Sequence, residues 1–263
     1  MPDIYAYTGD ANMRMNNEAT WTAARDASVA ETIDTTATAY SAGIRELRLS
    51  SVQNTVRRYY LAVDTSGISI KPASAVLKIY GYVNNGSNLI AVKVNQAATG
   101  SASSAFDAAD FGQIDFNTPY SDEFTGTWST TGYNEFELND AALTEMVNFD
   151  VIKIAVIGHD HDYLDVVPAN GFTRTSGFYP ATATDVNNRP LISYVTGTIP
   201  PLIAEGVADP SSIDSSFIVT LYNSGSLNAQ YERKIEQVPF SLGIRGPLSL
   251  RGRTSSSVVV PKK

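Results

Sequence analysis

The sequence predicts an all-β protein whose main part is an antiparallel β-sandwich of the jelly-roll type with one short helix. Short apolar segments alternate with turn-rich segments along the chain, as in sandwiches and barrels rather than α/β folds. Charged residues make up only 17% of the 263 residues, and 14 tyrosines far outnumber two tryptophans. The apolar content of 43% is enough for a hydrophobic core.

Two strands are expected in the first third of the chain, at residues 58–63 and 76–83, because apolar and polar side chains alternate there. The turn at residues 84–88, Asn-Asn-Gly-Ser-Asn, tolerates positive φ and predicts a hairpin that returns along residues 89–94. The side chains expected on one face are Tyr59, Leu61 and Val63 in the first strand and Leu77, Ile79 and Val83 in the second.

Further elements follow the low-hydrophobicity segment 96–104, which predicts an exposed loop. Asn139 is the expected N-cap of a short helix that ends at Asn148. Residues 151–157 are almost continuously apolar, as in a central strand covered on both faces. A last strand at residues 191–195 completes the sandwich.

A composition change at residues 196–201, Thr-Gly-Thr-Ile-Pro-Pro, predicts a linker. The expected domains are therefore a sandwich at 1–195 and a C-terminal part at 196–263. In the latter, residues 217–222 and 228–235 predict a small β-hairpin, followed by an extended tail whose prolines and glycines prevent a helix.

The tail is basic, whereas the rest of the chain is acidic. Residues 231–263 hold seven basic and two acidic residues, a net charge of +5; the other residues hold 12 basic and 25 acidic, a net charge of −13. We expect such a tail to anchor the chain on a partner protein. The alternative is a terminal segment without a partner. The predicted anchoring side chains are Phe240, Leu242, Ile244, Arg245, Leu248, Leu250, Arg251 and Arg253.

Three segments resemble a known domain family. Residues 57–64, Arg-Arg-Tyr-Tyr-Leu-Ala-Val-Asp, followed by residues 73–80 are similar to its "R-Y-L-x-F-D … A-x-L-x-L-Y" pair. Residues 136–139, Phe-Glu-Leu-Asn, are similar to its "F-D-V-T" step, and residues 188–194 to its closing "R-P-x-L-x-V-x-Y" strand. The family is that of the DNRLRE jelly-roll domains, which are related to a carbohydrate-binding module family.

The resemblance covers residues 57–195 and implies a jelly roll and a sugar-binding ancestry. Such domains usually belong to exported surface proteins with a signal peptide. The start of this chain has neither a basic n-region nor an apolar h-region, so we expect no signal peptide. Together these points predict a tailed-bacteriophage virion protein that is made and assembled in the host cytoplasm, attached to capsid or tail, and present as a homo-oligomer, taken to be a trimer.

Candidate binding residues fall into two groups. Exposed aromatic rings can stack on the apolar C–H faces of sugars. Carboxylates two and three residues apart in the loop 158–165 can converge on a hard cation such as Ca²⁺, and His159 and His161 would suit a transition metal. The loop lacks the glycine-turned, twelve-residue spacing of a calcium loop, so a solvated turn after a buried strand is the favoured interpretation. The aromatic candidates are Tyr80, Tyr82, Trp128, Tyr133, Phe178 and Tyr179, and the metal candidates are Asp160, Asp162 and Asp165. A second acidic group is Asp107, Asp110 and Asp115.

Several functional classes are excluded or disfavoured. The absence of cysteine excludes disulfides, zinc–thiolate sites and thiol catalysis. No apolar run approaches the roughly 20 residues of a membrane helix, and the net charge of −8 argues against attraction of nucleic acid to the whole surface. No catalytic motif is present. We therefore expect a non-enzymatic virion structural or decoration protein without a required cofactor; a free glycan-binding adhesin is the alternative, and a polysaccharide-degrading enzyme is the third hypothesis.

Overall fold

The structure is a computed structural model that describes residues 1–36, 43–86, 88–96, 105–198, 203–205 and 220–222. Contacts divide the chain into the units Met1–Thr198 and Ile199–Lys263. Among the described residues of the second unit, β13 (Ile203–Glu205) pairs antiparallel with β14 (Thr220–Tyr222). Strand β14 falls within the predicted strand 217–222, but its described partner is β13. The predicted partner 228–235 and the eight predicted anchoring residues lie outside the described residues.

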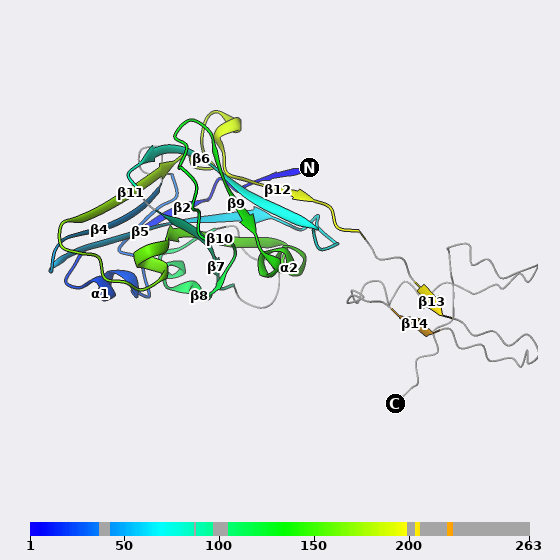
Figure 1. The fold of residues 1–263 in the computed structure, drawn as a ribbon, viewed down its shortest axis with the longest axis horizontal. Coiled ribbons are helices and arrows are strands. Elements are labelled where there is room, and N and C mark those ends of the chain that lie inside the picture. Colours follow the sequence, from blue (N-terminus) through cyan, green and yellow to red (C-terminus); the bar gives the residue numbers. More distant parts are fainter. Residues whose placement is uncertain (37–42, 87, 97–104, 199–202, 206–219, 223–263) are drawn as a thin grey trace, which may run out of the picture. The chain divides into compact units, whose positions relative to one another are not determined.

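The first unit is an antiparallel β-sandwich, as the sequence predicts (Figure 1). Its smaller layer, here called layer A, runs in the order β1 (Asp3–Tyr5), β12 (Leu191–Val195), β6 (Ser74–Asn84) and β9 (Tyr133–Leu138). Its larger layer, layer B, contains β3 (Thr32–Asp34), β2 (Ala11–Glu18), β5 (Gln53–Asp64), β4 (Gly43–Ser50), β11 (Phe172–Phe178), β10 (Val151–Gly158), β7 (Leu89–Val94) and β8 (Ile114–Pro119). The C-terminal end of β6 pairs with β11, so this one long strand joins the layers.

Apolar side chains from facing strands fill the space between the layers. Strands β5 and β10 contribute alternate residues, and β6 and β9 contribute Leu77, Ile79 and Phe136. Tyr59, Leu61 and Val63 all belong to this core with no exposed area, as their alternation predicts.

A second core covers the other face of layer B. It includes Met13, Tyr60, Val92 and Ile157 from the strands, and Trp21 from the short helix α1 (Trp21–Arg25). The 3₁₀ turn Ala108–Gln113 adds Phe111. Strand β10 is therefore buried along its whole length, as its continuous apolar sequence predicts.

The predicted helix is present as α2 (Asp140–Asn148). The Oδ1 atom of its N-cap, Asn139, accepts hydrogen bonds from the backbone N–H groups of Ala141 and Ala142 at 3.1 and 3.2 Å. Leu143 and Met146 are buried on its inner face. The sequence did not predict α1, the 3₁₀ turn Val186–Asn188 or the π turn His159–Tyr163. Among the described residues, no helix has the length and apolar character to span a membrane.

The predicted hairpin between β6 and β7 is wrong in its pairing. Both strands form, and Gly86 takes positive φ in the turn between them. However, β7 pairs with β10 and β8, whereas β6 pairs with β12, β9 and β11. Five of the six side chains of β7 are buried, so this strand needs neighbours on both edges and both faces. Val83 at the end of β6 is 40% exposed instead of facing the core, and the pairing of β6 with β11 shifts register near it.

Candidate functional site

Tyrosines gather on the outer face of layer A. Tyr80 and Tyr82 alternate with the core residues Leu77 and Ile79 along β6, so they point away from the core. Tyr133 of β9 lies directly opposite Tyr80 in the strand register, and the two ring centroids are 5.3 Å apart in an edge-to-face arrangement. A cross-strand aromatic pair therefore starts the site.

Tyr179 extends this pair into a continuous row. It follows the last residue of β11, and its backbone N–H donates to the carbonyl of Tyr80 at 3.0 Å. Its ring centroid lies 5.6 Å from those of both Tyr80 and Tyr82, again edge to face. We call Tyr82, Tyr179, Tyr80 and Tyr133 the tyrosine row. All four are half-buried, so each ring is supported by neighbours and still reaches solvent.

Backbone carbonyls fix two of the rings. The Tyr80 hydroxyl donates to the carbonyl of Thr131 at 2.6 Å, and the Tyr133 hydroxyl donates to that of Arg189 at 3.0 Å. Burial, followed by the charges of Tyr5, Asp3 and other neighbours, raises the pKa of Tyr133 to about 12. Its phenol therefore stays protonated at neutral pH and keeps its hydrogen bond.

The other two predicted aromatic residues do not belong to this surface. Trp128 and Phe178 are 5% and 0% exposed and lie in the core between the layers. Phe178 packs edge to face on Tyr59 at 4.5 Å and lies 6.2 Å from Trp128. Neither ring can present its face to a sugar, so both are corrected to core residues. Alternation along the chain explains the difference, because Phe178 and Tyr179 point to opposite faces.

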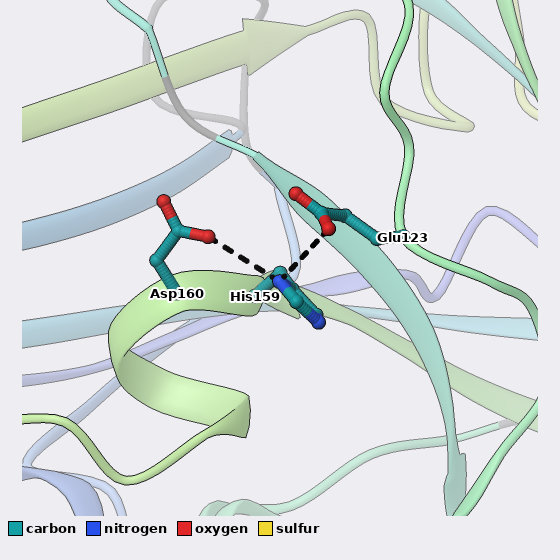
Figure 2. Close-up of side chains that lie close together, drawn as sticks. All are labelled: Glu123, His159 and Asp160. Carbon is teal, nitrogen blue, oxygen red and sulfur yellow. Dashed lines mark hydrogen bonds and ion pairs between the residues drawn. The ribbon is translucent and has the colours of Figure 1, made fainter.

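A second cluster surrounds the turn after β10 (Figure 2). The Nδ1 atom of His159 lies 3.4 Å from a carboxylate oxygen of Glu123 and 3.3 Å from one of Asp160. Its ring stacks on that of Tyr163, with centroids 5.6 Å apart. One nitrogen and two carboxylates thus face one another, and all three side chains are partly exposed. Glu123 was not predicted, because it precedes His159 by more than thirty residues and lies outside any local motif.

The partners of Asp160 decide what this cluster can hold. The second carboxylate oxygen of Asp160 accepts a hydrogen bond from Arg174, and Asn88 donates to the same carboxylate at 3.3 Å. Burial would raise the pKa of Asp160, but the bonds from Arg174, His159 and Asn88 outweigh it and lower the pKa. Ca²⁺ takes six to eight oxygen ligands, and a guanidinium beside one carboxylate opposes a cation. The cluster is therefore better suited to joining the turn to β11 through ion pairs.

The three aspartates predicted as metal ligands are not brought together. Asp162 has no exposed area, and its carboxylate oxygens accept hydrogen bonds from Arg58 at 2.7 and 2.8 Å. The side chain of Asp165 is 57% exposed and lies 3.5 Å from Arg25. Only Asp160 belongs to the cluster with His159. Because the chain turns sharply at residues 159–163, neighbouring carboxylates of the loop point in different directions.

The second acidic group also has local roles. Asp107 caps the turn Ala108–Gln113, and the carboxylate of Asp110 accepts a hydrogen bond from the backbone N–H of Asp107 in a reciprocal capping box. Asp115 accepts hydrogen bonds from the backbone of Asn117 and the hydroxyl of Thr118, both at 2.9 Å. These carboxylates stabilise turns rather than converge on one point.

Comparison with protein-family models finds no match, and neither does comparison with curated proteins. The resemblance to DNRLRE domains therefore stays a prediction carried by the quoted motifs. The site must be judged on its geometry, and the tyrosine row collects four of the six predicted aromatic residues on one accessible face.

Proposed function

We propose that the Met1–Thr198 unit is a non-enzymatic carbohydrate-binding domain and that the tyrosine row is its binding surface. The observation that carries the proposal is that four of the six predicted aromatic residues form one edge-to-face row on an outer sheet face. Aromatic rings held in place offer apolar contact to sugar C–H groups at a small entropic cost.

The charges beside the row favour a neutral sugar. Glu135 and Glu137 lie on the same outward face of β9 as Tyr133, and Asp3 and Asp185 raise the pKa of Tyr133 through their charge. Lys78 is already paired with Glu135 at 3.1 Å. An anionic polysaccharide would meet like charges at this face, whereas an uncharged glycan would not.

Truncation of the row tests the proposal. Tyr80→Ala and Tyr179→Ala are each expected to weaken binding to a neutral glycan, identified on an array, by about 10-fold or more, since aromatic anchors dominate such contacts. Tyr7→Ala, a half-buried tyrosine outside the row, is the matched control and should leave the dissociation constant unchanged.

Titration calorimetry in the presence and absence of EDTA measures this effect and any metal requirement together. Equal affinity of the wild type and both row variants would contradict the assignment. Loss of binding with EDTA would instead favour a Ca²⁺-dependent site, and turnover of the polysaccharide would favour the enzyme hypothesis.

We also propose that the chain acts as a virion decoration protein and that residues 196–263 attach it to a capsid or tail protein. The charge difference between residues 1–230, net −13, and residues 231–263, net +5, supports this proposal, because an acidic partner surface would attract the basic end of the chain and repel the rest. Virions display such proteins in repeated copies, so the proposal includes a homo-oligomer, taken to be a trimer.

Deletion of residues 237–263 tests the attachment. The shortened chain is expected to keep the circular dichroism of a folded β protein and its glycan affinity, but to be missing from purified particles. Incorporation of the shortened chain at the wild-type level would rule out this role of the tail. A chain that binds glycans with no particle partner would be the free adhesin.

A further inference from the structure

The sequence contains two Asn-Gly pairs, and the structure places both in exposed turns. Asn85-Gly86 follows the last residue of β6, and Asn170-Gly171 directly precedes β11. Both asparagines are exposed, and both glycines take positive φ, 73° at Gly86 and 83° at Gly171. The same chemical unit therefore occurs twice in one chain, in two different surroundings.

An Asn-Gly pair brings together two groups that can react with each other. The backbone nitrogen of the glycine can attack the side-chain carbonyl carbon of the asparagine, because glycine has no Cβ to obstruct the approach and its backbone turns easily. The new N–C bond closes a succinimide ring, and the side-chain amide leaves as ammonia together with the glycine proton. Water then opens the ring at either carbonyl, which leaves aspartate or isoaspartate. The reaction needs no oxidant, reductant or cofactor.

The hydrogen bond of the glycine N–H distinguishes the two turns. The N–H of Gly171 donates to the main-chain carbonyl of Arg48 at 2.7 Å, beside the register pair that begins the ladder of β11 with β4. The N–H of Gly86 donates to a side-chain oxygen of Asn84 at 2.9 Å. Because Asn84 is exposed, rotation of its side chain releases the Gly86 N–H. Release of the Gly171 N–H requires the end of the ladder to open.

The turn at Asn85 also leaves the reacting atoms accessible. The backbone N–H of Asn85 donates to the carbonyl of Thr175 at 2.8 Å, which holds the N-terminal side of this residue on β11. Its side-chain amide forms no hydrogen bond with a described residue. Beyond the adjacent residues, no described atom lies within 4 Å of the position that a Cβ of Gly86 would occupy. The same holds for Gly171, so crowding does not separate the two turns.

We propose that Asn85 is a site of spontaneous deamidation in the folded protein and that the main-chain hydrogen bond of Gly171 protects Asn170. Conversion of Asn85 adds one negative charge to the turn that follows Tyr82. In the isoaspartate product it also adds one carbon atom to the main chain between β6 and β7. Water is the co-reactant. The modification does not depend on the tyrosine row or on its proposed function.

Incubation of the full chain at pH 8, followed by peptide mapping with mass spectrometry, measures both sites in the same molecule. Each product carries an acid in place of an amide, and ¹⁸O-labelled water places one heavy oxygen atom in it. In the folded protein, Asn85 is expected to convert about 10-fold faster than Asn170, since one main-chain hydrogen bond must be broken at the second site. In urea the two rates should become equal, because the hydrogen bonds that separate them are lost.

Two matched variants locate the modification. Asn85→Gln keeps an exposed amide but lengthens the side chain by one methylene group, so that attack would have to close a larger and less favourable ring. Conversion of this turn should then no longer be detected. Asn170→Gln makes the same change in the other turn and should leave the conversion of Asn85 unchanged.

Two results would overturn the proposal. Equal conversion of Asn85 and Asn170 in the folded protein would show that the partner of the glycine N–H does not control the reaction. Retention of the Asn85 amide in the folded protein, over a period in which the chain in urea converts, would show that the fold protects this turn as well.

Discussion

Replacing Arg58 with methionine is expected to lower the free energy of unfolding by about 3–5 kcal/mol, because it leaves the carboxylate of Asp162 buried without its partner. Arg58 and Asp162 are 1% and 0% exposed. Besides two bonds to Asp162, the guanidinium donates to the carbonyls of Phe111 and Arg25 at 3.0 and 2.6 Å. It thereby ties α1, the turn Ala108–Gln113 and the turn after β10 to the sheet.

Urea unfolding of three variants checks this expectation. Arg58→Met combined with Asp162→Leu should recover most of the loss, since replacing both charges removes the unpaired group. Lys78→Met breaks the more exposed pair with Glu135 and should cost less than about 1 kcal/mol. A loss of that small size for Arg58→Met would show that the buried pair does not hold the second core together.

Glu46→Gln is expected to change how stability depends on pH. Glu46 is 1% exposed, one of its carboxylate oxygens accepts from the backbone N–H of Asp162 at 3.0 Å, and the other has no partner. Burial, and then the charge of Asp162, raises the pKa of Glu46 to about 8. The carboxyl group is therefore protonated in the folded protein at neutral pH.

The direction of the effect follows from proton linkage. Between the ordinary glutamate pKa near 4.5 and the folded value of about 8, the folded state holds a proton that the unfolded state has lost. The stability that the folded protein owes to the protonated carboxyl of Glu46 is fully present below pH ~4.5 and is lost as the pH rises through 8. The free energy of unfolding of Glu46→Gln should match that of the wild type at pH 5 and exceed it by about 2–4 kcal/mol at pH 9.

Urea unfolding at pH 5, 7 and 9 measures the difference. Glu137→Gln, an exposed glutamate of β9, is the control and should follow the wild type at each pH. Parallel pH profiles of the wild type and Glu46→Gln would mean that Glu46 is ionised in the folded state, and the proposed protonation would be wrong.

Much of the sandwich could be predicted because its strands carry local patterns. Alternation marks β5 and most of β6, continuous apolar sequence marks β10, and the N-cap Asn139 marks α2. Strand partners carry no such local mark. The turn at residues 84–88 indicates a reversal of the chain but does not choose between β6 and β10 as the neighbour of β7. Strand β2 has a largely polar sequence, so its hydrophobicity pattern did not predict a strand there.

The tyrosine row could be predicted in part for the same reason. Tyr80 and Tyr82 are visible as outward residues of one strand, but only the register places Tyr133 beside them. The one-residue step from Phe178 to Tyr179 separates core from surface, and composition cannot resolve it. The aspartates of the loop after β10 misled the metal prediction, because the partner of Asp162 is Arg58, more than a hundred residues earlier.

The location of bound glycan on the surface is the most direct test of the proposed function. When a neutral oligosaccharide is added, the amide and aromatic NMR chemical shifts of the full chain should change at the four tyrosines of the row, Tyr80, Tyr82, Tyr133 and Tyr179. The chemical shifts of His159, Asp160 and Arg57 should remain unchanged. Shifts confined to the turn after β10, with the tyrosine row unaffected by a sugar that binds, would contradict the account.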